Sequence, residues 1–516
     1  MNLTTEPWIP TVWNDGEFRM VSLSDVFAHG EEVSDLAVRP PERVSLMRLL
    51  ICVAHAALDG PANREDWQTC RTKIAPCALD YLRRWGAAFD LFGSAQRYLQ
   101  VSGLEKPRNE SKDDEGNLVS KLDFALATGN NSTLFDNAGG SERTFTPAEI
   151  ASMLTTFQCF SPGGRIGIAL WNGLETNGKG SSSHAPCLAD GMLHALVRGE
   201  NLLATLHKNL MTKQQAAEFF GKDSWGKPVW ESMPDGLHDS YALKNATCTY
   251  LGRLVPLARM IWLNDDCRSL ILANGLEYPS YEAGWRESSA TIVVRSIKGS
   301  PKRIVLRASL EKATWRELNA LTVKVVGHNP GGPAALQNIP GGEDAFDLWV
   351  GGLVSDQSKI VDTTESVFHV PAAMLQEKGQ QAYELGVKFA ETAEARLRRA
   401  VSTYHKEVGD DLDRPGFKEH RNKVQGKSIV RFWTDIEQAV SQLLEVAENP
   451  EKLEPTREWR KTDWGQSVLS ALRAAYEWAC PHETPRQIKA YALGLKRLFS
   501  APAERASVGG PEEVEA

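Results

Sequence analysis

The stretch Leu348–Pro371 reads LWVGGLVSDQSKIVDTTESVFHVP and separates two segments of different character. It opens with three apolar residues that lead into the pair Gly351-Gly352. Because glycine adopts backbone angles closed to other residues, we expect this pair to turn the chain sharply. A tip of four polar residues follows, which offers carboxylate, amide, hydroxyl and ammonium groups: Asp356, Gln357, Ser358 and Lys359. The stretch predicts either a stiff ribbon whose tip enters a narrow groove, or a solvated β-hairpin without a partner.

Length and composition indicate a folded protein of more than one domain. The chain has 516 residues, of which 42% are apolar and 24% charged, and its net charge is -8. An acidic balance argues against a protein that coats nucleic acid non-specifically, so any nucleic-acid binding must come from local basic patches. The N-terminus lacks a basic start before an apolar run, and the sequence lacks the ~18 consecutive apolar residues of a membrane span. We therefore expect a cytoplasmic protein.

The sequence gives little support to metal or nucleotide chemistry. None of the eight cysteines form a CxxC pair and the eleven histidines include no HExxH, so we predict no metal and no cofactor. The segment Gly173–Ser181 is a near miss to a phosphate-binding P-loop, because Gly180 follows Lys179 where Ser or Thr is needed. A flexible basic loop fits it better, and a P-loop-like enzyme remains an alternative. The adjacent Asp265 and Asp266 are more typical of a turn than of a nuclease centre.

Before residue 371 the signals predict a mixed α+β domain. An N-terminal hairpin turns at Asn14-Asp15-Gly16, and apolar residues at helical spacing predict a core helix over Pro41–Leu58. Thr146-Pro147-Ala148-Glu149 predicts a capped helix that stops before Ser161-Pro162-Gly163-Gly164. Residues 249–321 are expected to be rich in β-strands.

Several polar or basic loops of this domain could contact nucleic acid. Gly163 and Gly164 would let a nucleic-acid groove approach the backbone, although a tight helix–strand turn uses the same residues. Arg268 is predicted on a turn between two strands. In the loop 128–137, which includes Asn131 and Asn137, Phe135 could stack on a base or plug the core. A predicted hairpin carries a basic patch without an intervening acid: Arg295, Lys298, Lys302, Arg303 and Arg307.

Beyond Pro371 the pattern becomes helical. Apolar residues at helical spacing predict four amphipathic helices, over Ala372–Val408, Ser428–Ala447, Thr456–Cys480 and Thr484–Phe499. Short links between them predict an antiparallel four-helix bundle. The run Arg414–Arg431 holds six basic residues, among them Arg421, Lys423 and Lys427, against one acid, which favours phosphate contacts over a merely solvated face. We therefore predict an α+β domain over 1–371, a four-helix bundle over 372–500 and a disordered tail over 501–516.

These residues together resemble a known family, the large subunit CasA of the type I-E CRISPR surveillance complex Cascade. The resemblance covers most of the chain. It rests on four segments in order, followed by the helical region: Pro7-Trp8-Ile9-Pro10, Thr146-Pro147-Ala148-Glu149 through Gln158-Cys159-Phe160-Ser161-Pro162-Gly163-Gly164, Tyr250-Leu251-Gly252-Arg253-Leu254-Val255-Pro256-Leu257, and Leu348-Trp349-Val350-Gly351-Gly352 with Gln357 and Lys359.

The resemblance implies a non-catalytic subunit in an RNA-guided antiviral complex. Guide RNA pairs with one DNA strand, while the large subunit reads a short adjacent motif, the PAM, from the minor groove of the duplex. A glycine loop, a basic finger and a glutamine-tipped wedge do this reading, and the wedge starts R-loop formation. Gln357 matches the wedge, Gly163 and Gly164 match the glycine loop, and Arg268 stands where relatives often have Lys.

The resemblance also implies further partners. The loop around Phe135, with Asn131 and Asn137, resembles the segment that docks on the guide-RNA handle and neighbouring subunits. The basic faces of the bundle, with Arg421, Lys423 and Lys427, are expected to hold DNA phosphates, and the family recruits a helicase-nuclease. A generic scaffold subunit is the remaining alternative, and it predicts no difference between duplexes with and without the PAM.

Overall fold

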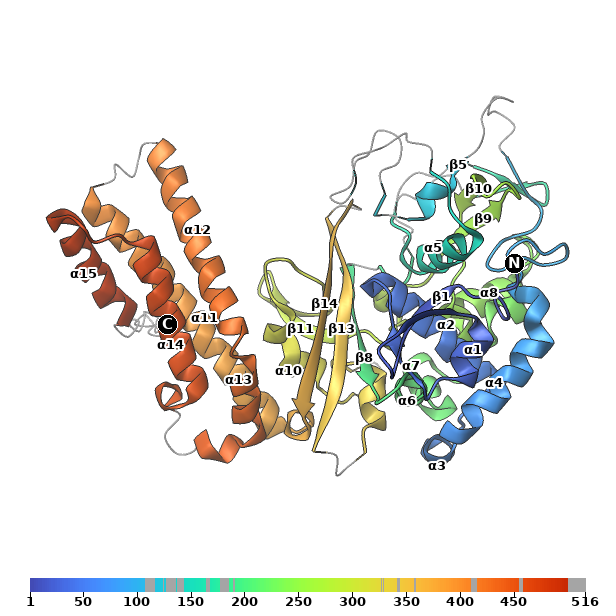
Figure 1. The fold of residues 1–516 in the computed structure, drawn as a ribbon, viewed down its shortest axis with the longest axis horizontal. Helices are drawn as coiled ribbons and strands as arrows, with labels where there is room; N and C mark the ends of the chain where they lie inside the picture. Colours follow the sequence, from blue (N-terminus) through green and yellow to red (C-terminus); the bar gives the residue numbers. More distant parts are fainter. Residues whose placement is uncertain are drawn as a thin grey trace, which may run out of the picture. The chain divides into compact units, whose positions relative to one another are not determined.

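The computed structural model describes residues 1–106, 117–123, 125–126, 136, 143–163, 168–176, 185–188, 191–325, 327, 329–340, 344–356, 359–409, 415–453 and 458–499. The chain divides into two compact units, Met1–Leu375 and Gln376–Ala516 (Figure 1). The first unit mixes helices with small sheets and the second is helical, which confirms the predicted fold class. None of the described helices is both long enough and apolar enough to span a membrane.

The strands of the first unit form small antiparallel sheets rather than one large sheet. Within the described residues there are five sheets. In strand order they are β2 (Phe18–Val21), β1 (Ile9–Trp13) and β3 (Val33–Leu36); β5 (Asn117–Leu118), β10 (Ser269–Asn274) and β9 (Arg259–Leu263); β11 (Ile292–Ile297) and β12 (Ser300–Val305); β14 (Lys359–Pro371), β13 (Ala345–Asp356) and β8 (Leu193–Arg198); β4 (Leu104–Glu105), β6 (Leu170–Trp171) and β7 (Leu174–Glu175).

Helix α2 (Pro40–Leu58) is the centre of the core of the first unit. Its residues from Val44 to His55 are all buried, and it packs against α4, α5, α9 and β13. The other helices of the unit are α1 (Leu23–Ala28), α3 (Arg64–Thr69), α4 (Arg71–Trp85), α5 (Pro147–Phe160), α6 (Leu202–Asn209), α7 (Lys213–Phe220), α8 (Ser240–Cys248), α9 (Tyr250–Leu254) and α10 (Leu318–Leu321).

Local sequence signals place several of these elements correctly. Ser22 caps α1, and Thr146 and Glu149 form the reciprocal capping box of α5, so backbone N–H groups at both helix starts have acceptors. The strands β9 to β12 confirm the β-rich prediction between residues 259 and 305. The prediction was wrong for Tyr250–Leu254 and Leu318–Leu321, which are helices α9 and α10. At α9 the Thr249 side chain caps the N–H of Gly252 and so favours a helix start.

The second unit is built around one long helix. Helix α11 (Glu377–Val408) packs against α12 (Pro415–Glu437), α13 (Val440–Glu448), α14 (Asp463–Ala479) and α15 (Pro485–Phe499). The predicted helix over 428–447 has wrong bounds. It begins at Pro415, whose fixed backbone angle suits a first helical position, and it is interrupted at Gln438 and Ala439, where α12 gives way to α13.

Candidate nucleic-acid interface

The hairpin β13–β14 is the longest strand pair in the described chain. Its ladder runs from Ala345 opposite Pro371 to Asp356 opposite Lys359, with one register shift after Val354. Gln357 and Ser358 lie outside the described residues. Its base is firmly packed, since Leu348, Trp349 and Val350 are at most 1% exposed. The hairpin predicted from the sequence therefore exists and has an apolar base, and its last described pair joins two of the four predicted tip residues, Asp356 and Lys359.

The prediction of a sharp turn at Gly351-Gly352 was wrong. Both glycines lie in the middle of β13, where Gly351 pairs with Glu365 and His194, and Gly352 pairs with Thr364 and Leu193. A Cβ atom at Gly351 would lie 2.6 Å from the Trp349 ring, and one at Gly352 would lie 2.6 Å from the Met192 carbonyl oxygen. Glycine is needed at both positions because neighbouring groups approach β13 too closely for a side chain, which is a common reason for glycine within a strand.

A polar network clamps the base of this hairpin to the core. The Trp349 indole N–H donates to Glu365 at 2.5 Å, and the Arg43 guanidinium lies over the Trp349 ring at 5.7 Å. The Nε of Arg43, on α2, lies 3.3 Å from the same Glu365 carboxylate, and Arg43 also pairs with Asp35 on β3. Arg198 on β8 donates to Asp35 at 2.9 Å. Three other elements, α2, β3 and β8, thus orient the hairpin. Sequence reasoning placed Trp349 in the apolar base but missed the roles of the charged residues: Arg43, Asp35, Arg198 and Glu365.

A buried arginine, Arg259, fixes the C-terminal end of α5. Gln158 donates to the Arg259 carbonyl oxygen at 2.9 Å and accepts from the Arg259 N–H at 2.9 Å. The Arg259 side chain, 1% exposed, donates to the Pro162 carbonyl oxygen directly before Gly163. Burial lowers the pKa of Arg259 to about 10, so its guanidinium stays charged at neutral pH. Gly163 is half-buried, and Gly164 lies outside the described residues.

Arg268 lies where the sequence predicted it, on the turn between β9 and β10. Its side chain is exposed and its N–H donates to Asp266 at 2.9 Å. The neighbouring Asp265 pairs with Arg97 at 2.8 Å, so the two aspartates have structural partners. In the part of the chain that the structure describes, no three His, Cys, Asp or Glu side chains group as metal ligands. Helix α5 and strands β9 and β10 lie in the upper half of the first unit in Figure 1, and β13 ends and β14 begins in that half.

The other predicted contact residues have mixed outcomes. Phe135, Asn131 and Asn137 lie outside the described residues. On helix α12, Lys423 and Lys427 are exposed and Arg421 is half-buried. For Asp356 and Lys359 only the strand pairing is described.

The near-miss P-loop begins differently from a phosphate-binding loop. Gly173 has φ +80° and lies in the turn between β6 and β7, whereas a P-loop glycine precedes a helix. Lys179, Gly180 and Ser181 lie outside the described residues.

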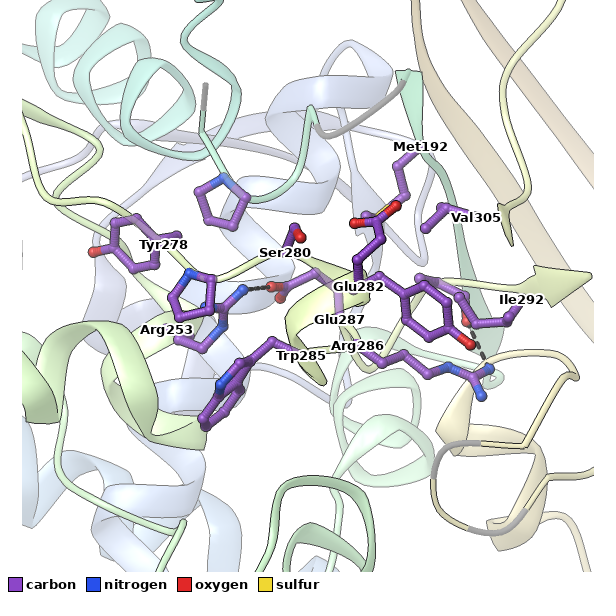
Figure 2. Close-up of a pocket in the computed structure, with 14 residues that line it drawn as sticks. Met192, Arg253, Tyr278, Ser280, Glu282, Trp285, Arg286, Glu287, Ile292 and Val305 are labelled. Atoms are coloured by element: carbon purple, nitrogen blue, oxygen red, sulfur yellow. Dashed lines mark hydrogen bonds and ion pairs between the residues drawn. The ribbon is translucent and has the colours of Figure 1, made fainter. Parts of the chain in front are cut away.

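A buried charge cluster and a cavity lie between α2, α9 and the loop before β11. Glu287 accepts from Arg48 at 2.8 Å and from Arg253 at 2.6 Å, and all three side chains are at most 6% exposed. Burial raises the pKa of Glu287, but Arg253 and Arg48 outweigh it and lower the pKa to about 2. The cavity has a volume of about 260 Å³. Figure 2 shows Arg253 and Glu287 at one side of it and Arg286, Ile292 and Val305 at the other.

This cluster has a structural explanation. It holds together segments that are more than 200 residues apart in the chain, since Arg48 also donates to the Leu254 and Arg253 carbonyl oxygens at 2.9 and 2.6 Å. A buried pair of this kind stabilises a fold only while all its partners are present. The Arg286 guanidinium donates to the carbonyl oxygens of Ala290 and Gly331 at 2.9 and 2.7 Å, which fixes the loop before β11.

Comparison with known proteins gives one consistent family. The model of the family described as CRISPR-associated protein Cse1 matches residues 2–469. A CRISPR-associated protein CasA/Cse1 from Thermus thermophilus is 30% identical over 440 residues, which are 80% of this chain and 79% of that protein. The crystal structure of CasA from Thermus thermophilus matches with TM-score 0.74 and 24% identity over 96% of this chain and 98% of that one.

A chain of a structure titled CRISPR RNA-guided surveillance complex has the same fold, with TM-score 0.69 and 20% identity over 97% of this chain and 99% of that one. These matches span both units, and the family model alone covers most of the sequence. The chain therefore belongs to the CRISPR-associated Cse1 family.

Proposed function

We propose that this chain is the large, non-catalytic subunit of a type I-E CRISPR surveillance complex, and that it reads the PAM in duplex DNA. Membership of the Cse1 family supports a place in such a complex, beside guide RNA and other subunits. The observation that carries the reading role is the β13–β14 hairpin, whose base is clamped by Arg43, Glu365 and Trp349. A stiff base lets the tip push against a duplex without bending away.

In this proposal Gln357 is the wedge at the end of the hairpin, flanked by Asp356, Ser358 and Lys359. Its amide replaces hydrogen bonds that the first base pair loses on opening. Guide RNA then extends the opening by pairing with the target strand, and each step disrupts DNA stacking worth ~1.4 kcal/mol. Arg268, Gly163 and Gly164 contact the minor groove, where degenerate acceptors allow several PAM sequences. The cations Arg421, Lys423 and Lys427 hold DNA phosphates.

Further contacts follow from the same proposal. Phe135, Asn131 and Asn137 meet the guide-RNA handle and neighbouring subunits, the opened complex recruits a helicase-nuclease, and the protein works in the cytoplasm. No observation specifically favours the nucleotide-binding or the generic scaffold alternative.

The test is a reconstituted complex that carries Gln357→Ala. R-loop formation on a linear, PAM-bearing duplex is measured by permanganate reactivity of the displaced strand, with gel shifts of duplexes with and without the PAM at stated salt. We expect normal assembly and a marked loss of strand opening. Gln381→Ala on α11 is the matched control, because Gln381 is exposed and its side chain donates to Glu377, one turn earlier on its own helix, at 2.8 Å. Wild-type opening by Gln357→Ala would remove the wedge assignment.

A further inference from the structure

The hairpin β11–β12 forms a two-stranded sheet of its own. Its six residue pairs run from Ile292 opposite Val305 to Ile297 opposite Ser300. Ile292 and Val305 are buried beside the cavity of Figure 2, and the N–H of Ile292 donates to the Gly331 carbonyl oxygen at 2.9 Å. From Val294 onward every residue of β11 is exposed. The hairpin therefore has an anchored base and a distal part in water.

This distal part is strongly basic within an acidic chain. Residues 292–307 contain no Asp or Glu and hold five cations: Arg295, Lys298, Lys302, Arg303 and Arg307. The whole chain has a net charge of -8, so this density of positive charge is local to the hairpin. A basic segment of this kind is the electrostatic footprint expected for phosphate binding.

The strand register places the cations on both faces and at the tip. Arg295 pairs with Lys302 on one face, and Val294 pairs with Arg303 on the other. Lys298 occupies the two-residue turn with φ +52°, where Asn or Gly is favoured. Like charges directly opposite each other are also unfavourable. The sequence thus keeps positive charge at two positions where the fold alone would favour other residues.

Three of these cations lack a counter-ion within the described chain. Lys298, Lys302 and Arg303 are exposed and make no ion pair with any described residue. Arg295, by contrast, pairs with Glu317 at 2.5 Å, and Lys312 pairs with the same carboxylate at 2.5 Å. A groove of about 370 Å³ runs beside the hairpin, lined by Arg295, Arg307, Lys312 and Glu317 among others. Cations outnumber acids along it.

We infer that the β11–β12 hairpin is a second DNA-binding element, which holds phosphates of the double-stranded DNA outside the opened region. A two-stranded ribbon fits the major groove of B-form DNA, where phosphates lie on both sides of it. Cations on both faces of the hairpin match that arrangement. A single DNA strand bound to one face would contact either Lys302 or Arg303 but not both. The inference rests on the proposed function for the presence of duplex DNA.

The experiment compares the wild-type complex with one that carries Lys298→Ser, Lys302→Ser and Arg303→Ser together. Affinity is measured from about 50 to about 300 mM salt for a PAM-bearing duplex, a PAM-less duplex and a single strand of the same sequence. Each lost phosphate contact lowers the slope of log affinity against log salt by about 0.9, so we expect the slope for both duplexes to fall by about 2 to 3. The single-strand slope should not change.

A matched variant controls for net charge. Arg71→Ser, Arg83→Ser and Lys213→Ser remove the same three charges from positions paired with Glu200, Asp80 and Asp59. We expect its duplex slope to stay within about 0.5 of wild type, far less than the drop for three phosphate contacts.

The outcomes separate the inference from the proposed function. An unchanged duplex slope in the hairpin variant, an equal loss for the single strand, or loss of guide RNA from the complex would each overturn the inference. Failure of the wild type to distinguish PAM-bearing from PAM-less duplex would refute PAM reading alone, because both duplexes carry the same phosphates.

Discussion

Glu287→Gln is predicted to be among the most destabilising substitutions of a single carboxylate in the first unit. The side chain is 6% exposed and accepts from two buried arginines, Arg48 and Arg253. Its pKa of about 2, against an ordinary 4.5, corresponds to about 3 kcal/mol at pH 7, at about 1.4 kcal/mol per pKa unit. Removing one partner of a buried pair costs about 3 to 5 kcal/mol, which agrees. We expect a loss of about 3 kcal/mol in stability.

The sign of the pH dependence follows from the same shift. A carboxyl group with a lowered folded-state pKa contributes stability above its unfolded pKa of 4.5, and that contribution is lost as the pH falls toward about 2. Glu287→Gln should therefore remove about 3 kcal/mol of the pH dependence of wild-type stability within this window, besides lowering stability at pH 7.

The assay must report on the first unit, because a chain of two units need not unfold in one step. Hydrogen exchange of α2 backbone amides, measured by mass spectrometry, gives the free energy of opening at the helix that carries Arg48. Glu282→Gln is the control, since Glu282 lines the same cavity but is exposed. If the two variants lower protection equally, within about 0.5 kcal/mol, the cluster does not stabilise the fold as argued.

Two further predictions follow. Burial lowers the pKa of both His55 and His194 to about 4. Below pH 6.5 the unfolded chain therefore binds more protons than the folded chain. As the pH falls from 6.5 to 4, the free energy of unfolding should fall by about 1.4 kcal/mol per pH unit for each histidine. Urea unfolding measured across this range would contradict the prediction if the free energy did not change. Gly352→Ala should lower stability by about 1 to 3 kcal/mol, because the added Cβ clashes with the Met192 carbonyl oxygen. Gly426→Ala is the control: its Cβ would lie in open space on α12, so this variant should raise the melting temperature. Equal effects of the two variants would refute the packing argument.

The sequence predicts best where the signal is local. Thr146 and Glu149 define the start of α5, and Asn14-Asp15-Gly16 defines the first hairpin, because the interacting groups lie within a few residues of each other. The start of α12 was also local, at Pro415, and could have been found by treating that proline as a first helical residue.

Tertiary roles could not be predicted in the same way. Gly351-Gly352 has the composition of a turn, and only the approach of Trp349 and Met192 explains it as strand. The partners of Arg43 at the hairpin base lie on three other elements, and Arg259 reaches Pro162 from a strand 97 residues further along the chain. Among the candidate site residues, Arg268 lies on the turn where it was expected. Roles at Gln357 and the glycine loop stay predictions.

The position of β14 at the edge of its sheet has a consequence for how the isolated chain behaves in solution. β13 has β8 on one side and β14 on the other, so β14 has one edge without a strand partner in the described sheet. A long edge strand of this kind offers backbone N–H and C=O groups with which a strand of a second molecule can pair. The succession Asp362, Thr363, Thr364, Glu365 and Ser366 makes that edge polar, which disfavours self-association of the chain.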